Sequence, residues 1–299
     1  MIHDIPTSEA ARMLFREVRL LKRGLSLLWH AIDHFFLPQF QSLLAPWLRP
    51  VATLSHPLDA QVPFRPQEVV AYLGYITFWF KTMRFFYDRL GREALPDICE
   101  SMDEVLMLYR EAGAIYRRCQ STTTTRARMP MLPYFAVIYL LDPHLHCIPS
   151  LHLLLICHNH ISAARIIRRR GLSAEEYGPM LEEVVAEAVR ITEAVLLVKQ
   201  HSLLDLAPTL FLLTARFPDY GPQVVEAFVD RLFLQWDLPE GSRGLMRSLL
   251  KAGYGGFVEE WEAKGRTGCR ELVLEFLNRY VPGSPRRSSS SLRRRRGGW

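Results

Sequence analysis

Apolar residues recur at intervals of three and four along most of this 299-residue chain. This spacing puts them on one face of an α-helix, and the segments 65–91 and 95–119 are long examples. Gly91 follows the first segment, where glycine commonly ends a helix. We find no alternating strand pattern of useful length and no internal repeat. The sequence therefore predicts an all-α fold, a multi-helix bundle.

A third long helix is predicted over residues 172–205. Ser173 and Glu176 have the spacing of a capping box at its start. Pro208 is expected to kink or end this helix after Asp205, because proline cannot continue the hydrogen-bonding pattern.

We expect residues 1–283 to form a single helical domain. Residues 120–133 are polar, β-branched and proline-containing, and are interpreted as a loop. Two further amphipathic segments are predicted near 222–236 and 256–281.

The positive charge of the chain is concentrated at its C-terminal end. Residues 284–299, "SPRRSSSSLRRRRGGW", contain six arginines and no acid. Removing these six from the 37 basic residues leaves 31, which equals the 31 acidic residues, so the rest of the chain is formally neutral. This low-complexity tail is predicted to be disordered. It could bind an anionic membrane surface, and we predict no nucleic-acid partner because the body shows no basic face.

No segment has the features of a good membrane span. The longest candidate, 24–48, is interrupted by Asp33 and two prolines. The five cysteines form no CxxC pair and are interpreted as free thiols in a reducing compartment. We expect a cytoplasmic or peripheral membrane protein, with an integral membrane protein as the alternative.

Two short fragments in the middle of the chain combine polar residues of catalytic type. In "VKQHSLLD" (198–205), His201 and Asp205 are four residues apart and would share a helix face. An aspartate that accepts from one imidazole nitrogen leaves the other free as base or nucleophile. Lys199 lies where it could reach a bound anion. The alternative is a His–Asp pair that merely satisfies itself on a helix surface.

The second fragment is "HCIPSLH" (146–152). Pro149 favours an abrupt helix start, Ser150 is a good N-cap, and His152 falls in the first turn. Helix N-termini bind phosphate well, because their free N–H groups carry positive partial charge. The alternative is plain capping, with His152 as a core histidine.

Together the fragments resemble two of the three motifs of the type 2 phosphatidic acid phosphatase superfamily, which includes the vanadium haloperoxidases. The second family motif, PSGH, has the counterpart "PSLH" at 149–152, a variant that is similar to the inositol phosphorylceramide synthase branch. The third, SR followed by five residues, His, three residues and Asp, is matched at His201 and Asp205. The resemblance covers about 125–215, which we take as a phosphatase-like core.

This chain departs from the family pattern in its basic residues. Ala194 and Val195 stand where the third motif has Ser-Arg. The first motif is not reproduced, and its nearest counterpart contains Arg126 and Arg128. With Lys199, these two arginines are the candidates for a replacement phosphate clamp.

The resemblance implies a metal-independent phosphoric ester hydrolase or phosphotransferase. His201 would form a phosphohistidine while Asp205 holds it in position, and His152 would protonate the leaving alcohol. Ser150 would help to stabilise the phosphate oxygens through its N–H and hydroxyl, together with Lys199, Arg126 and Arg128. The expected partner is a phosphorylated lipid or a small phosphate ester, with no cofactor and no metal.

Two other interpretations remain. Five histidines lie at positions 144, 146, 152, 158 and 160, but their spacing matches no known metal motif, so surface or core histidines are expected. The missing family arginine also allows a catalytically inactive helical scaffold or binding protein of the same fold.

Overall fold

A computed structural model describes residues 1–124 and 133–282, and the all-α prediction is confirmed. The helices are α1 Thr7–Arg16, α2 Val18–Ala31, α3 Leu37–Leu44, α4 Val69–Leu90, α5 Leu95–Tyr116, α6 Pro133–Leu141, α7 Leu151–Arg170, α8 Ala174–Leu197, α9 Leu206–Arg216, α10 Pro222–Asp230, α11 Glu240–Ala263 and α12 Cys269–Asn278. The strands are β1 Val51–Leu54 and β2 Gln120–Thr123. The predicted tail at 284–299 lies outside the described residues.

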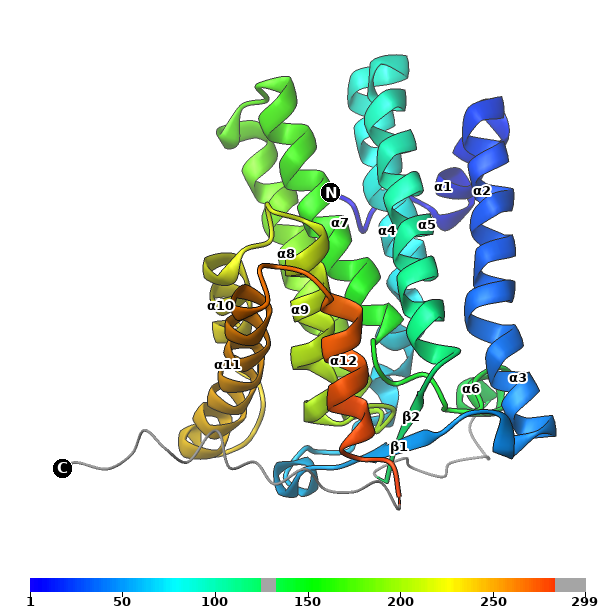
Figure 1. Cartoon of the computed structure of the whole chain (residues 1–299). Coiled ribbons are helices and arrows are strands. Elements are labelled where there is room, and N and C mark those ends of the chain that lie inside the picture. The colour runs from blue at the N-terminus through cyan, green and yellow to red at the C-terminus, as the bar shows by residue number, and fades with distance from the viewer. Residues whose placement is uncertain (125–132, 283–299) are drawn as a thin grey trace.

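The long helices lie side by side as a bundle, and β1, β2, α3 and α6 gather at one of its ends (Figure 1). We call this end the strand end. Helix α7 packs against α4, α5, α8 and α9. Its first residues, 151–157, are all buried, as expected for a helix that is apolar all round. The start of α7 is therefore fixed by neighbours on several sides.

The strands β1 and β2 pair in parallel, with Val51 opposite Gln120 and Leu54 opposite Thr123. The prediction of a loop over 120–133 is therefore wrong for its first four residues. The β-branched threonines favour extended backbone. Their hydrogen-bonding partners lie about seventy residues earlier in the chain, which local pattern does not reveal.

Two predicted helix ends are found in the structure. Gly91 has a φ of 60° and follows α4, a conformation that glycine adopts without strain. Ser173 caps α8 by accepting from the N–H of Glu175. The Glu176 carboxylate accepts from Arg89 instead of completing a capping box.

The helix predicted over 172–205 is shorter than expected. Helix α8 ends at Leu197, and Lys199 adopts a positive φ of 58° that breaks the helix. A short 3₁₀ helix, Leu203–Asp205, leads into α9. Pro208 lies in the first turn of α9, where its missing N–H costs no helical hydrogen bond.

The C-terminal helices also differ from their predicted limits. Helix α10 ends at Asp230, earlier than the predicted 236. The segment predicted at 256–281 contains the end of α11 and all of α12. Gly265 and Gly268, both with positive φ, separate the two helices.

None of the helices in the described ranges combines the length and apolar character needed to cross a bilayer.

Candidate functional site

The structure brings the two sequence fragments together at the strand end. The hydroxyl of Ser150 lies 3.4 Å from Nε2 of His201. The rings of His152 and His201 have centroids 6.2 Å apart. These side chains come from the start of α7 and from the turn after α8, so packing of the two helices creates the juxtaposition.

Ser150 is the N-cap of α7, as predicted, and its hydroxyl accepts from the N–H of Leu153. Its own N–H donates to the hydroxyl of Thr209 at 3.0 Å. Thr209 in turn donates to the carbonyl of Asp205 at 2.7 Å. The Ser150 N–H, expected to bind phosphate, is thus engaged by Thr209. Its hydroxyl remains directed at His201.

His201 and Asp205 are in contact, but not because they share a helix face. His201 lies in the turn after α8, and Asp205 ends the 3₁₀ helix. The distance from His201 Nδ1 to Asp205 Oδ2 is 3.0 Å, and the same oxygen accepts from the N–H of Ser202 at 2.9 Å. Because a carboxylate only accepts, we assign the proton to Nδ1. The Nε2 lone pair then faces the Ser150 hydroxyl.

These groups are almost fully buried. Asp205 has no exposed surface, while His201 and His152 are 7% and 9% exposed. Burial raises the pKa of Asp205, and the hydrogen bond from His201 opposes this rise. His152 lies against the rings of Tyr72 and Tyr75, with centroids 4.1 and 4.2 Å away. Burial, and then the nearby His201, hold the pKa of His152 well below 6.5.

Asp59 supports the turn that carries this pair, and sequence analysis missed it. Its carboxylate accepts from the hydroxyl of Ser202 at 2.6 Å, from the N–H of Leu203 at 2.8 Å and from the N–H of His56 at 2.7 Å. Asp59 is buried and about 140 residues from the turn in sequence. Only the folded chain reveals this connection.

The basic residues expected to clamp phosphate are not assembled in the described ranges. Lys199 donates to the carbonyls of Asp59 and Val62, at 3.1 and 2.5 Å, so its ammonium braces a loop. Burial lowers the pKa of Lys199. Arg126 and Arg128 lie outside the described residues. Ala194 and Val195 are fully buried in the last turns of α8.

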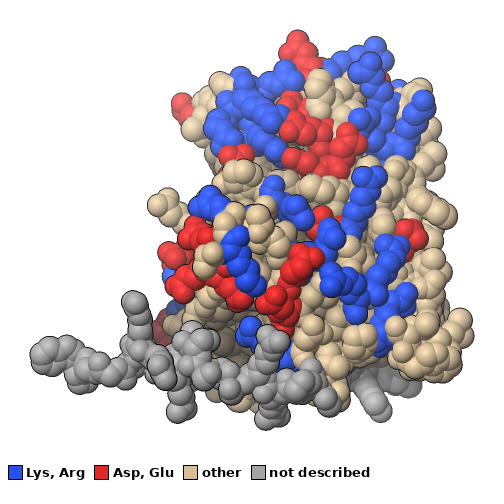
Figure 2. Space-filling view, in the orientation of Figure 1, with Lys and Arg blue, Asp and Glu red and all other residues tan. Residues whose placement is uncertain are grey.

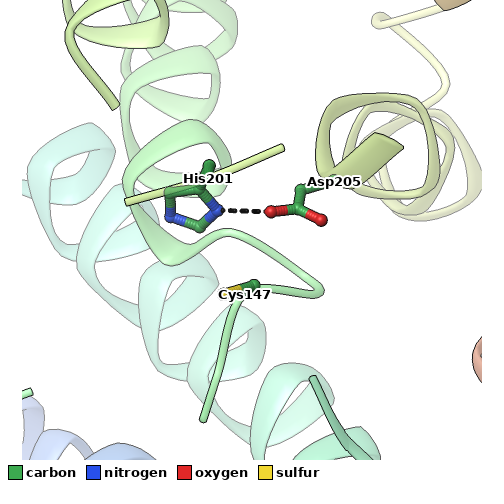
Figure 3. Close-up of side chains that lie close together, drawn as sticks. All are labelled: Cys147, His201 and Asp205. Carbon is green, nitrogen blue, oxygen red and sulfur yellow. Dashed lines mark hydrogen bonds and ion pairs between the residues drawn. The ribbon is translucent and has the colours of Figure 1, made fainter. Parts of the chain in front are cut away.

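One group of side chains has the composition of a metal site. Ligand atoms of Cys147, His201 and Asp205 all lie within 4.8 Å of one another (Figure 3). A thiolate, an imidazole and a carboxylate suit Zn²⁺. The spacing of the histidines gave no sign of this set, since Cys147 joins it from the loop before α7. A zinc ion would compete for His201 and Asp205, which bond each other here.

The neighbouring histidines have structural partners. His146 stacks on Tyr116 at a centroid distance of 3.8 Å, and His158 Nε2 lies 2.9 Å from a carboxylate oxygen of Glu104. His144 Nε2 lies 2.7 Å from the carbonyl of Gln200. These contacts agree with the expectation of core histidines.

The side chains of the site are almost fully buried. Two hollows on the described surface, one lined by α4 and α8 and one near α12, contain none of its side chains.

Comparison of the chain with protein-family models, with curated proteins and with solved structures found no match.

Proposed function

We propose that this protein is a metal-independent phosphoric ester hydrolase or phosphotransferase that acts on a lipid phosphate through a phosphohistidine. One observation carries the proposal. His201 is held by Asp205 at Nδ1, and its Nε2 faces the Ser150 hydroxyl at the N-terminus of α7. An oriented imidazole beside a helix N-terminus combines a nucleophile with an anion site.

The reaction proceeds in two displacements. His201 Nε2 attacks phosphorus, the bond from phosphorus to the ester oxygen breaks, and His152 gives a proton to the departing alcohol. His152 then takes a proton from water or from an acceptor alcohol. The resulting oxygen attacks phosphorus and releases His201. Water as acceptor gives phosphatase activity, and an alcohol gives transfer.

Groups at the start of α7 would stabilise the negative charge on the phosphate oxygens. The first N–H groups of this 20-residue helix and the Ser150 hydroxyl favour an anion. Arg126 and Arg128 are the proposed cationic supplement, while Lys199 supports the site through the loop at Asp59. The burial of Ser150 strengthens its interaction with an anion.

Two alternatives follow from specific observations. The engagement of Lys199 with backbone carbonyls favours an inactive scaffold or binding protein of the same fold. The closeness of Cys147 to His201 and Asp205 favours a metal-dependent site. Both differ from the proposal in what they predict for a covalent intermediate.

We expect an acid-labile phosphohistidine at residue 201 after rapid quenching with a phosphate ester in EDTA. Its detection by mass spectrometry would support the nucleophilic role, because neither a scaffold nor a metal-activated water forms this bond. Cys147→Ala is the matched control, since a thiol is needed only by the metal site. Loss of turnover in EDTA, or in Cys147→Ala, would favour the metal alternative. Absence of both turnover and label would favour the scaffold.

We expect kcat/KM to fall as the pH rises. The apparent pKa of this fall should lie below 6.5, because it reports the loss of the proton from His152. Leaving-group protonation needs the cationic imidazole, and its depressed pKa leaves it neutral in the free enzyme at neutral pH. Above that apparent pKa, kcat/KM should fall by about tenfold for each pH unit.

His152→Asn should remove this pH dependence for an alkyl phosphate. It should preserve most turnover of a nitrophenyl phosphate, whose leaving group needs no proton. Equal losses on both substrates would contradict a general-acid role.

A further inference from the structure

The strand end exposes a compact group of large apolar side chains. Helix α3 and the 3₁₀ turn that follows it, Pro46–Leu48, present them to solvent. Leu44 is 85% exposed and Trp47 is 82% exposed, which is unusual for such side chains. We call the group the apolar end; its members are Phe40, Leu43, Leu44, Trp47 and Leu48.

The apolar end is held in a fixed shape. Arg49 folds back on α3 and donates to the carbonyl of Pro38, the hydroxyl of Ser42 and the side-chain carbonyl of Gln41, at 3.3, 3.0 and 2.8 Å. These bonds hold the Trp47 turn against the helix. A preorganised apolar projection loses little conformational entropy when it binds.

The segment that carries the apolar end contains no acidic residue. No aspartate or glutamate occurs between Asp33 and Asp59. Figure 2 shows a mostly uncharged area at the lower right of the view, where α3 lies, with Lys and Arg side chains beside it. An apolar segment that carries no acid is compatible with an anionic partner.

The described chain ends beside β1, at the strand end. The N–H of Thr53 donates to the carbonyl of Tyr280 at 3.1 Å, and the described chain ends two residues later. Thr53 is five residues from Leu48, so the two backbones are at most about 17 Å apart. Residues 283–299 contain six arginines and no acid. The apolar surface and the residues from which the polybasic segment continues thus lie at the same end.

We propose that the apolar end docks on an anionic lipid bilayer, with the arginine-rich segment as the second contact. Stable membrane anchoring commonly takes two such signals, insertion and a polybasic patch, and tryptophan favours the membrane interface. A second copy of this chain fits less well, because pairing through this end would bring two arginine-rich segments together.

Docking in this way brings the candidate site to the membrane. Strand β1 begins three residues after Leu48, and β2 pairs with it. Ser121 of β2 accepts from the N–H groups of Cys147 and Ile148, at 3.2 and 2.7 Å. The loop that leads to Ser150 is therefore fixed to the apolar end through the two strands. The catalytic use of this orientation rests on the proposed function, whereas the binding of the apolar end to a membrane does not.

Flotation of the full chain with vesicles tests the proposal. We expect binding to phosphatidylcholine vesicles that contain phosphatidylserine. Leu44→Glu combined with Trp47→Glu should weaken partitioning by about tenfold or more. Both residues are highly exposed, so folding should be retained. Leu245→Glu is the matched control, because Leu245 is 60% exposed on α11, and it should bind like the wild type.

A variant with all six tail arginines changed to serine should lose the preference for phosphatidylserine. Unchanged binding of the Leu44/Trp47 variant would overturn the proposal. A dimer of the wild type in solution that becomes a monomer in this variant would also overturn the proposal. His201→Ala should float like the wild type, so failure of docking and failure of the proposed chemistry are separable.

Discussion

His201→Ala should reduce phosphate release by about 10³-fold or more, with little change in folding. The substitution removes the atom that attacks phosphorus, and the remaining anion site cannot replace it. Release should be measured on a panel of lipid phosphates and a soluble aryl phosphate, in EDTA, for wild type and variant. Circular dichroism and thermal unfolding should verify that the variant is folded.

His160→Ala is the control for this experiment. It removes another imidazole from α7, two turns beyond His152, where burial lowers the pKa of His160 to about 4. Its packing partner is Tyr220, at a centroid distance of 6.5 Å. Turnover should survive in this variant. Release at background level from both the wild type and His201→Ala would argue against hydrolysis, and would leave either a transferase that lacks its acceptor or the inactive scaffold.

Much of the fold could be predicted because it follows from local pattern. Helix α4 ends just before Gly91, and α8 begins after Ser173, through signals that act within one turn. Strand β2 could not be found in this way, since its partner β1 is remote in sequence. The end of α8 at Leu197 was missed for a similar reason. The turn that follows is stabilised by Asp59, whose position no local pattern encodes.

The candidate site shows the same division. The spacing of His201 and Asp205 predicted a contact, and the contact exists, although a turn and not a helix face produces it. Ser150 was identified because N-caps have a local signature. Cys147, Thr209 and Tyr72 join the site only through packing. Lys199 was expected at the anion, but folding directs its ammonium to backbone carbonyls.

Asp59→Ala should lower the free energy of unfolding by about 3 kcal/mol and also reduce turnover. The substitution leaves the Ser202 hydroxyl and the Leu203 N–H without their acceptor in a buried setting. These two groups fix the turn between His201 and Asp205, so the imidazole should lose its orientation. Chemical denaturation gives the stability change, and steady-state kinetics on a soluble aryl phosphate gives the catalytic change.

Two further variants separate positioning from general destabilisation. Asp97→Ala removes a different buried carboxylate. Asp97 lies on α5, far from His201 in sequence, and pairs with Arg170 at 2.8 Å. It should lower stability and leave kcat nearly unchanged. Asp59→Asn retains one acceptor oxygen and should recover part of kcat. If Asp59→Ala and Asp97→Ala lowered kcat equally, the loss would reflect stability alone. A selective loss of kcat with little change in KM would instead mean that the remote carboxylate orients the reacting imidazole, since substrate binding would be intact while its attack was impaired.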